Sequence, residues 1–160
     1  MKTFLKLFIF LSITLAVLSF SITRDGYIFT PTGEGQIFLD SGVYEGFPLP
    51  DYASDMIASN YKSYFIEVEP GLKVHILEIG TGLPIFLMHG NPTSGFLYRK
   101  VAERLPLDEV RVIMPTSIGL GFSSKIPASD HTLENHIRWI NTVLEKLELT
   151  ELIYAGQDWG

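Results

Sequence analysis

The most informative stretch of the chain for its fold is GQDWG at residues 156–160, which directly follows the apolar run at residues 152–155. A glycine two residues before and two residues after an aspartate is typical of a sharp turn from a strand into a helix, which lifts the central side chain out of the sheet. Glycine is needed on both sides because a Cβ atom there would collide with neighbouring backbone. The spacing therefore predicts that Asp158 presents its carboxylate at the carboxyl end of a strand.

Strands and helices alternate upstream of this turn. The run PIFLM at residues 84–88 is continuously apolar, as in a strand that is covered on both faces. The turn residues EPG at 69–71 predict a hairpin between two shorter β-type runs. We expect strands at residues 64–68, 74–79, 84–88, 110–114 and 152–155. We also expect a helix that ends at Pro106 and has Leu97, Val101 and Leu105 on one face. A longer helix should follow, with these residues on its buried side: Leu133, Ile137, Ile140, Val143, Leu144 and Leu147. This order predicts an α/β fold with a mostly parallel sheet flanked by helices.

The motif HGNP at residues 89–92 follows one of these expected strands. The second half of an oxyanion site would have to come from such a position. An aspartate at the 156–160 turn needs no base to activate it, because its reference pKa of about 3.9 leaves it ionised at neutral pH. A carboxylate suits attack on a saturated carbon and gives an alkyl ester, which water can open. The residues therefore predict a hydrolase that acts on alkyl halides or epoxides.

Three motifs in this order resemble the haloalkane dehalogenases of the α/β-hydrolase superfamily: HGNPTSG at 89–95, GLGFS at 119–123 and GQDWG at 156–160. The resemblance runs from about residue 63 to residue 160. It therefore implies the N-terminal half of an α/β-hydrolase fold, truncated after the strand-to-helix turn that carries the nucleophile, the nucleophile elbow.

The resemblance also implies a role for each motif residue. Asp158 would be the nucleophile. Asn91 and Trp159 would bind the departing halide through the side-chain amide and the indole N–H, and their backbone N–H groups would form the oxyanion hole. The positions that support the motifs are His89, Gly90, Pro92, Gly156 and Gly160. At Thr116 family members usually carry aspartate, and we interpret this departure as a change in loop packing.

The residue at position 91 favours a halide over an epoxide as the leaving group. Asparagine and tryptophan supply N–H donors without a competing charge, which suits a leaving anion. An epoxide oxygen needs a proton donor, usually a cap tyrosine, and epoxide hydrolases tend to carry an aromatic residue where Asn91 lies. An epoxide hydrolase stays open as an alternative, as does a non-catalytic, membrane-tethered remnant.

The histidines of this chain do not supply the catalytic base that the superfamily order requires. In that order the nucleophile comes first, then the acid, then the histidine, whereas all four histidines precede Asp158. We expect His89 to shape its turn, His75 to be a structural or a surface residue, and His131 and His136 to lie at the start of a helix. We therefore expect the catalytic acid and base to be absent from these residues and the chain alone to be inactive for turnover.

Composition excludes several other classes of function. With 12 basic and 18 acidic residues the net charge is −6, which argues against nucleic acid as a partner. The absence of cysteine excludes disulfide scaffolds, thiolate zinc sites and cysteine nucleophiles. The sequence GLG at 119–121 lacks the third glycine of a dinucleotide fingerprint. We expect no metal and no cofactor, and a small apolar halogenated or epoxide substrate.

The N-terminal residues 1–23 predict a signal peptide or a membrane anchor. Two lysines precede an uncharged run from Leu7 to Thr23, which is the pattern of a secretory signal. Its length lies near the lower edge of the roughly 17 to 25 residues that span a bilayer. Membrane contact would involve residues 4–23, and a buried core helix is the alternative. We therefore expect the protein to be in the secretory pathway or periplasm, or at a membrane. For the rest of the chain we expect a linker or wrap-around segment at 24–60 and a partial α/β-hydrolase domain at 61–160.

Overall fold

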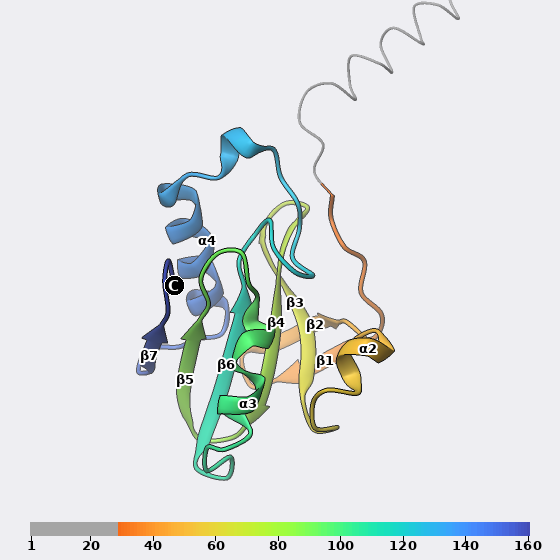
Figure 1. Ribbon diagram of the computed structural model, residues 1–160, viewed down its shortest axis with the longest axis vertical. Helices are drawn as coiled ribbons and strands as arrows, with labels where there is room; N and C mark the ends of the chain where they lie inside the picture. Colours follow the sequence, from red (N-terminus) through yellow and green to blue (C-terminus); the bar gives the residue numbers. More distant parts are fainter. Residues whose placement is uncertain (1–28) are drawn as a thin grey trace, which may run out of the picture.

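The computed structural model describes residues 29–160, and its main feature is a seven-stranded sheet with the order β1-β2-β3-β4-β6-β5-β7 (Figure 1). The strands are β1 (Gln36–Leu39), β2 (Gly42–Gly46), β3 (Lys62–Glu69), β4 (Leu72–Gly80), β5 (Leu83–Met88), β6 (Val110–Thr116) and β7 (Ile153–Gly156). The helices are α2 (Asp51–Ser54), α3 (Arg99–Ala102) and α4 (Leu133–Lys146), with 3-10 turns η1 (Gly95–Tyr98) and η2 (Ala128–Asp130). All five strands predicted from the sequence are present, as β3 to β7.

The sheet is mixed, whereas the sequence pattern predicts a mostly parallel one. Neighbouring strands from β1 to β4 run antiparallel, and β4 also pairs antiparallel with β6. Parallel pairing is confined to β6, β5 and β7. The reason lies in the connections, because a tight turn such as the one between β3 and β4 reverses the chain, while parallel neighbours need a longer crossover.

Strands β1 and β2 lie within the segment predicted as a linker or wrap-around segment. They form a hairpin in which Gln36 pairs with Glu45 and Leu39 pairs with Gly42, and β2 continues the sheet next to β3. This part of the 24–60 segment is therefore part of the sheet. The domain boundaries themselves stay predictions.

The predicted signal peptide or anchor at residues 1–23 lies outside the described residues, so export and membrane attachment also stay predictions. Within residues 29–160, no helix combines the length and the apolar character that crossing a bilayer requires.

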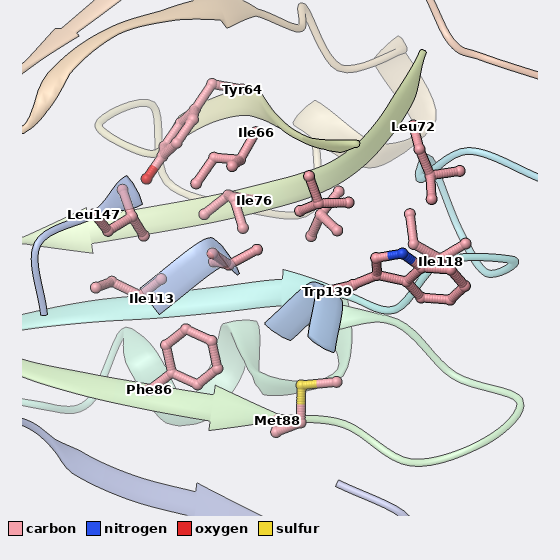
Figure 2. Packing of buried hydrophobic residues seen from close by; sticks show 13 residues of the cluster. Tyr64, Ile66, Leu72, Ile76, Phe86, Met88, Ile113, Ile118, Trp139 and Leu147 are labelled. Carbon is pink, nitrogen blue, oxygen red and sulfur yellow. The ribbon is translucent and has the colours of Figure 1, made fainter. Parts of the chain in front are cut away.

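The core has two layers, one on each face of the sheet. On one face α4 packs Trp139, Val143 and Leu147 against the sheet, and Figure 2 shows Trp139 and Leu147 near the side chains of the strands. Helix α4 begins where Thr132 accepts a hydrogen bond from the backbone N–H of Asn135 at 3.2 Å, a common N-cap arrangement. On the other face a second cluster contains Leu77, Ile79, Leu87, Ala102, Val112 and Met114. The sheet is therefore held between α4 and the η1–α3 segment.

The buried faces of the helices differ from those predicted. In α4, Leu133 and Ile137 are 67% and 52% exposed, whereas Trp139 is buried, because the contact with the sheet centres on the i, i+4, i+8 row that begins at Trp139. In the shorter helical segment Leu97 and Val101 are exposed, since a 3-10 turn precedes α3 and changes the periodicity from 3.6 to 3 residues.

His75 on β4 is a buried structural histidine, as the sequence suggests. Its ring contacts Phe47, Phe65 and Phe122, and its Nε2 lies 2.9 Å from the Ser63 hydroxyl. Burial lowers the pKa of His75 from 6.5 to about 3. The neutral imidazole is therefore the form that the fold accommodates.

This burial predicts a pH dependence of stability. The unfolded chain takes up a proton at position 75 below about pH 6.5, whereas the folded chain does not until about pH 3. The free energy of unfolding should therefore fall as the pH drops through this window, by up to about 1.4 kcal/mol per pH unit. Urea unfolding between pH 7 and pH 4 measures it. The variant His75→Gln, which keeps an acceptor for Ser63, should be less dependent on pH, and an unchanged dependence would contradict this account.

Candidate functional site

The loops after β5 and β7 meet at one edge of the sheet. The two strands are parallel neighbours, with Met88 opposite Gly156. The chain therefore leaves both strands at the same level, and the HGNP loop at 89–92 lies beside the turn at 157–160. The register explains how motifs separated by more than sixty residues in the sequence form a single site.

The turn after β7 has the geometry predicted for a nucleophile elbow. Asp158 has a φ of 60°, a left-handed conformation that is uncommon for a residue other than glycine. The turn is closed by the Gly160 N–H, which donates to the Gln157 carbonyl at 3.0 Å. A Cβ at Gly160 would overlap the Met88 carbonyl, and one at Gly156 would overlap the Gly160 carbonyl. The steric need for glycine on both sides is confirmed.

The carboxylate of Asp158 contacts the HGNP loop. The backbone N–H of Asn91 donates to Asp158 Oδ1 at 3.1 Å. Gly90 makes this approach feasible, because a Cβ at that position would overlap the Asp158 side chain. The Asn91–Pro92 peptide bond is cis. Of the two backbone donors predicted for the oxyanion hole, the structure places that of Asn91 on the carboxylate.

Trp159 and Asn91 lie on the wall of the same cavity. The cavity has a volume of about 830 Å³ and is bounded by the HGNP loop, the loop after β6, α4 and β7. Trp159 is 80% exposed. Apolar side chains of α4 also line this cavity, namely Leu133, Ile137, Ile140 and Leu144. The halide-binding pair predicted from the sequence therefore shares an apolar cavity.

His89 has both ring nitrogens occupied by backbone partners. Its Nε2 accepts the Ser117 N–H at 3.0 Å, so the proton must be on Nδ1, which lies 2.7 Å from the Gly90 carbonyl. Burial lowers the pKa of His89, and the bond to Gly90 offsets this only in part. These contacts support a neutral histidine that shapes the turn.

Two side-chain contacts around the site were not predicted. His131 Nδ1 and His136 Nε2 lie 3.1 Å apart, and burial together with the charge of His131 lowers the pKa of His136. Thr93 donates its hydroxyl to the Gly90 carbonyl. Neither contact has a short sequence signature, because each depends on how a loop folds back on itself.

Thr116, where the sequence departs from the family pattern, packs inside the loop region. Its hydroxyl accepts the Gly95 N–H at 3.1 Å, and its carbonyl accepts the Ser123 hydroxyl at 2.6 Å. The side chain is buried. This environment supports the interpretation as a change in loop packing. Within residues 29–160, no group of three or more His, Asp or Glu side chains is arranged to hold a metal ion.

Comparison with known proteins agrees with this geometry. Residues 84–160 match the alpha/beta hydrolase fold family. The chain is 37% identical over 120 residues to a haloalkane dehalogenase of Psychrobacter cryohalolentis, covering 70% of this chain and 37% of the relative. It is 40% identical over 90 residues to a haloalkane dehalogenase of Agrobacterium fabrum, covering 56% and 29%. The chain thus spans only 37% and 29% of the length of these two curated relatives.

Solved structures give the same result. The crystal structure of the haloalkane dehalogenase DatA from Agrobacterium tumefaciens superimposes with a TM-score of 0.60 at 36% identity, over 69% of this chain and 36% of that chain. The epoxide hydrolase VrEH1 from Vigna radiata gives a TM-score of 0.59 at 24% identity, over 63% and 31%. At that identity the second likeness shows the fold alone.

Proposed function

We propose that this chain, which belongs to the α/β-hydrolase superfamily and is haloalkane dehalogenase-like over its matched part, carries the nucleophile of a hydrolase that cleaves carbon–halogen bonds. The observation that supports this most is the Asp158 carboxylate, held on a left-handed backbone with Oδ1 against the Asn91 N–H. A carboxylate in this position can attack a saturated carbon without help from a base.

The proposed first step is a displacement at carbon. Because the Asn91 N–H engages Oδ1, the other carboxylate oxygen attacks the carbon that bears the halogen. A carbon–oxygen bond forms, the carbon–halogen bond breaks, and the halogen leaves as an anion. The products are an alkyl ester on Asp158 and a halide, which the side-chain N–H groups of Asn91 and Trp159 would solvate.

The proposed second step is hydrolysis of that ester. Water adds to the ester carbonyl carbon, and the negative charge that develops on Oδ1 is met by the Asn91 N–H, an arrangement that lowers the barrier. The bond between that carbon and the ester oxygen then breaks, which restores a carboxylate on Asp158 and releases the alcohol, whose oxygen takes up the proton that the water gave up. The water needs a base. In this superfamily the histidine base follows the nucleophile along the chain, and His75, His89, His131 and His136 all precede Asp158. The residues of this chain therefore supply the first step.

The experiment that tests this proposal uses two reagents with the same carbon skeleton. We expect 1-bromobutane to add one butyl group to the purified protein, with release of one bromide per adduct, and peptide mapping to place the group on Asp158. Reaction with 1,2-epoxybutane alone would instead support the epoxide hydrolase alternative. An unchanged mass with both reagents, or an adduct on another residue, would contradict the proposal and favour the alternative that the chain is a non-catalytic remnant.

A further inference from the structure

The peptide group between Gly90 and Asn91 has two functions at once. Its N–H donates to Asp158 Oδ1 at 3.1 Å, and its carbonyl oxygen belongs to Gly90. Because the peptide group is planar and trans, the N–H and the C=O point in opposite directions. Whatever fixes the direction of the Gly90 carbonyl therefore also fixes the direction of the oxyanion donor.

Three donors converge on the Gly90 carbonyl oxygen. The Thr93 hydroxyl lies at 2.7 Å, the backbone N–H of Thr93 at 3.0 Å and His89 Nδ1 at 2.7 Å. The Thr93 hydroxyl oxygen also lies 3.3 Å from His89 Nδ1, so the two side chains act on the carbonyl together. A carbonyl oxygen has two lone pairs, which these donors fully use.

We propose that Thr93 is a positioning residue for the reaction of Asp158: its hydroxyl, together with His89, holds the Gly90–Asn91 peptide so that the Asn91 N–H faces the carboxylate. This inference rests on the proposed function. Rotation of the peptide would turn the Gly90 carbonyl dipole toward the carboxylate, which is repulsive. Hydrogen bonds to the carbonyl also polarise the peptide and strengthen its N–H as a donor.

Thr93 is the better of the two side chains for a test. His89 is buried and also holds the loop after β6 through Ser117, so its replacement would disturb packing. Thr93 is half-buried, and valine reproduces its shape without the hydroxyl. Thr93→Ser keeps the hydroxyl and loses only a methyl group. Thr142→Val is a matched control, because it removes a hydroxyl that donates to a backbone carbonyl in α4.

The experiment has a spectroscopic and a chemical readout. We expect Thr93→Val to shift the backbone amide resonance of Asn91 and to speed its hydrogen exchange by about tenfold, and to slow butyl transfer from 1-bromobutane to Asp158 by about tenfold. This is less than the roughly hundredfold to thousandfold cost of losing an oxyanion donor itself. Thr93→Ser should stay within about threefold of the parent in both readouts, and Thr142→Val should match the parent. If the valine variant does not fold, Thr93→Ala, which also lacks the hydroxyl, is measured in its place.

The outcomes separate this inference from the function on which it rests. If the parent protein forms no adduct, the proposed function fails, and the Asn91 amide still reports whether Thr93 positions the peptide. If Thr93→Val leaves that amide unchanged, the positioning role is overturned. If Thr93→Ser is as impaired as Thr93→Val, the hydroxyl is not the group responsible and the inference is likewise overturned.

Discussion

Replacement of Asp158 by asparagine is expected to abolish butyl transfer from 1-bromobutane, with a rate at least about ten-thousandfold below that of the parent. The substitution is nearly isosteric, and the amide oxygen of asparagine can still accept the Asn91 N–H that the carboxylate accepts at 3.1 Å. The turn should therefore stay folded while the nucleophile loses its charge. Time-resolved intact-mass spectrometry of the two proteins under identical conditions measures the ratio.

The control for this prediction is an aspartate without a role in the site. Asp108 is exposed and lies before β6, so Asp108→Asn removes the same charge from the protein and should react like the parent. An adduct that forms equally well on Asp158→Asn would show that another group is alkylated. That result would remove the main support for the proposed mechanism.

The elbow was the part of the structure that the sequence predicted best. Part of its conformation depends on contacts within a few residues, such as the overlap that a Cβ at Gly156 would make with the Gly160 carbonyl. Such steric requirements restrict these positions to glycine, so they can be recognised in the sequence. The meeting of Asp158 with Asn91 was predictable for a related reason, because parallel strands place their carboxyl ends at one edge of the sheet.

The hairpin of β1 and β2 was not predicted because its strands have only four and five residues. A segment of this length gives a weak periodic signal. The exposed residues Leu133 and Ile137 of α4 were misassigned for a different reason. Helical periodicity identifies an apolar stripe, but only the packed structure determines which part of a wide stripe contacts the sheet.

The carbonyl contacts of Gly90 could not be predicted at all. They require Thr93 to fold back onto the HGNP loop and Ser117, from the loop after β6, to orient His89. No spacing in the sequence encodes that convergence. The sequence thus predicts which groups react, whereas the structure reveals which groups hold them.

Removal of Glu78 is expected to cost about 3–5 kcal/mol in the free energy of unfolding. The carboxylate is 1% exposed and accepts hydrogen bonds from the Tyr64 hydroxyl at 2.6 Å and from Arg111 Nη2 at 2.7 Å. Burial and then the charge of Glu78 raise the pKa of Tyr64 well above its usual value. Glu78→Ala would leave the buried Tyr64 hydroxyl and the Arg111 guanidinium, whose side chain is 19% exposed, without their partner. Urea unfolding at pH 7 measures the loss.

Lys62 provides the matched control for the Glu78 network. Its ammonium lies 3.4 Å from Glu78, but its side chain is 42% exposed. Water and salt therefore screen this pair, and Lys62→Ala should cost less than about 1 kcal/mol. If Lys62→Ala and Glu78→Ala were equally destabilising, the carboxylate would act as a general counter-charge rather than as the partner of Arg111.

A combined variant tests where the cost arises. If Glu78→Ala is destabilising because it leaves Arg111 and Tyr64 without a hydrogen-bond partner, then removing those polar groups as well should recover most of the lost stability. We expect Glu78→Leu, Arg111→Leu and Tyr64→Phe together to be more stable than Glu78→Ala, since a buried polar group can often be replaced by packed apolar side chains at little cost. If the combined variant is even less stable than Glu78→Ala, the hydrogen bonds and ion pair among these three side chains would themselves stabilise the junction of β3, β4 and β6. The cost of Glu78→Ala would then not come only from polar groups that have lost their partner.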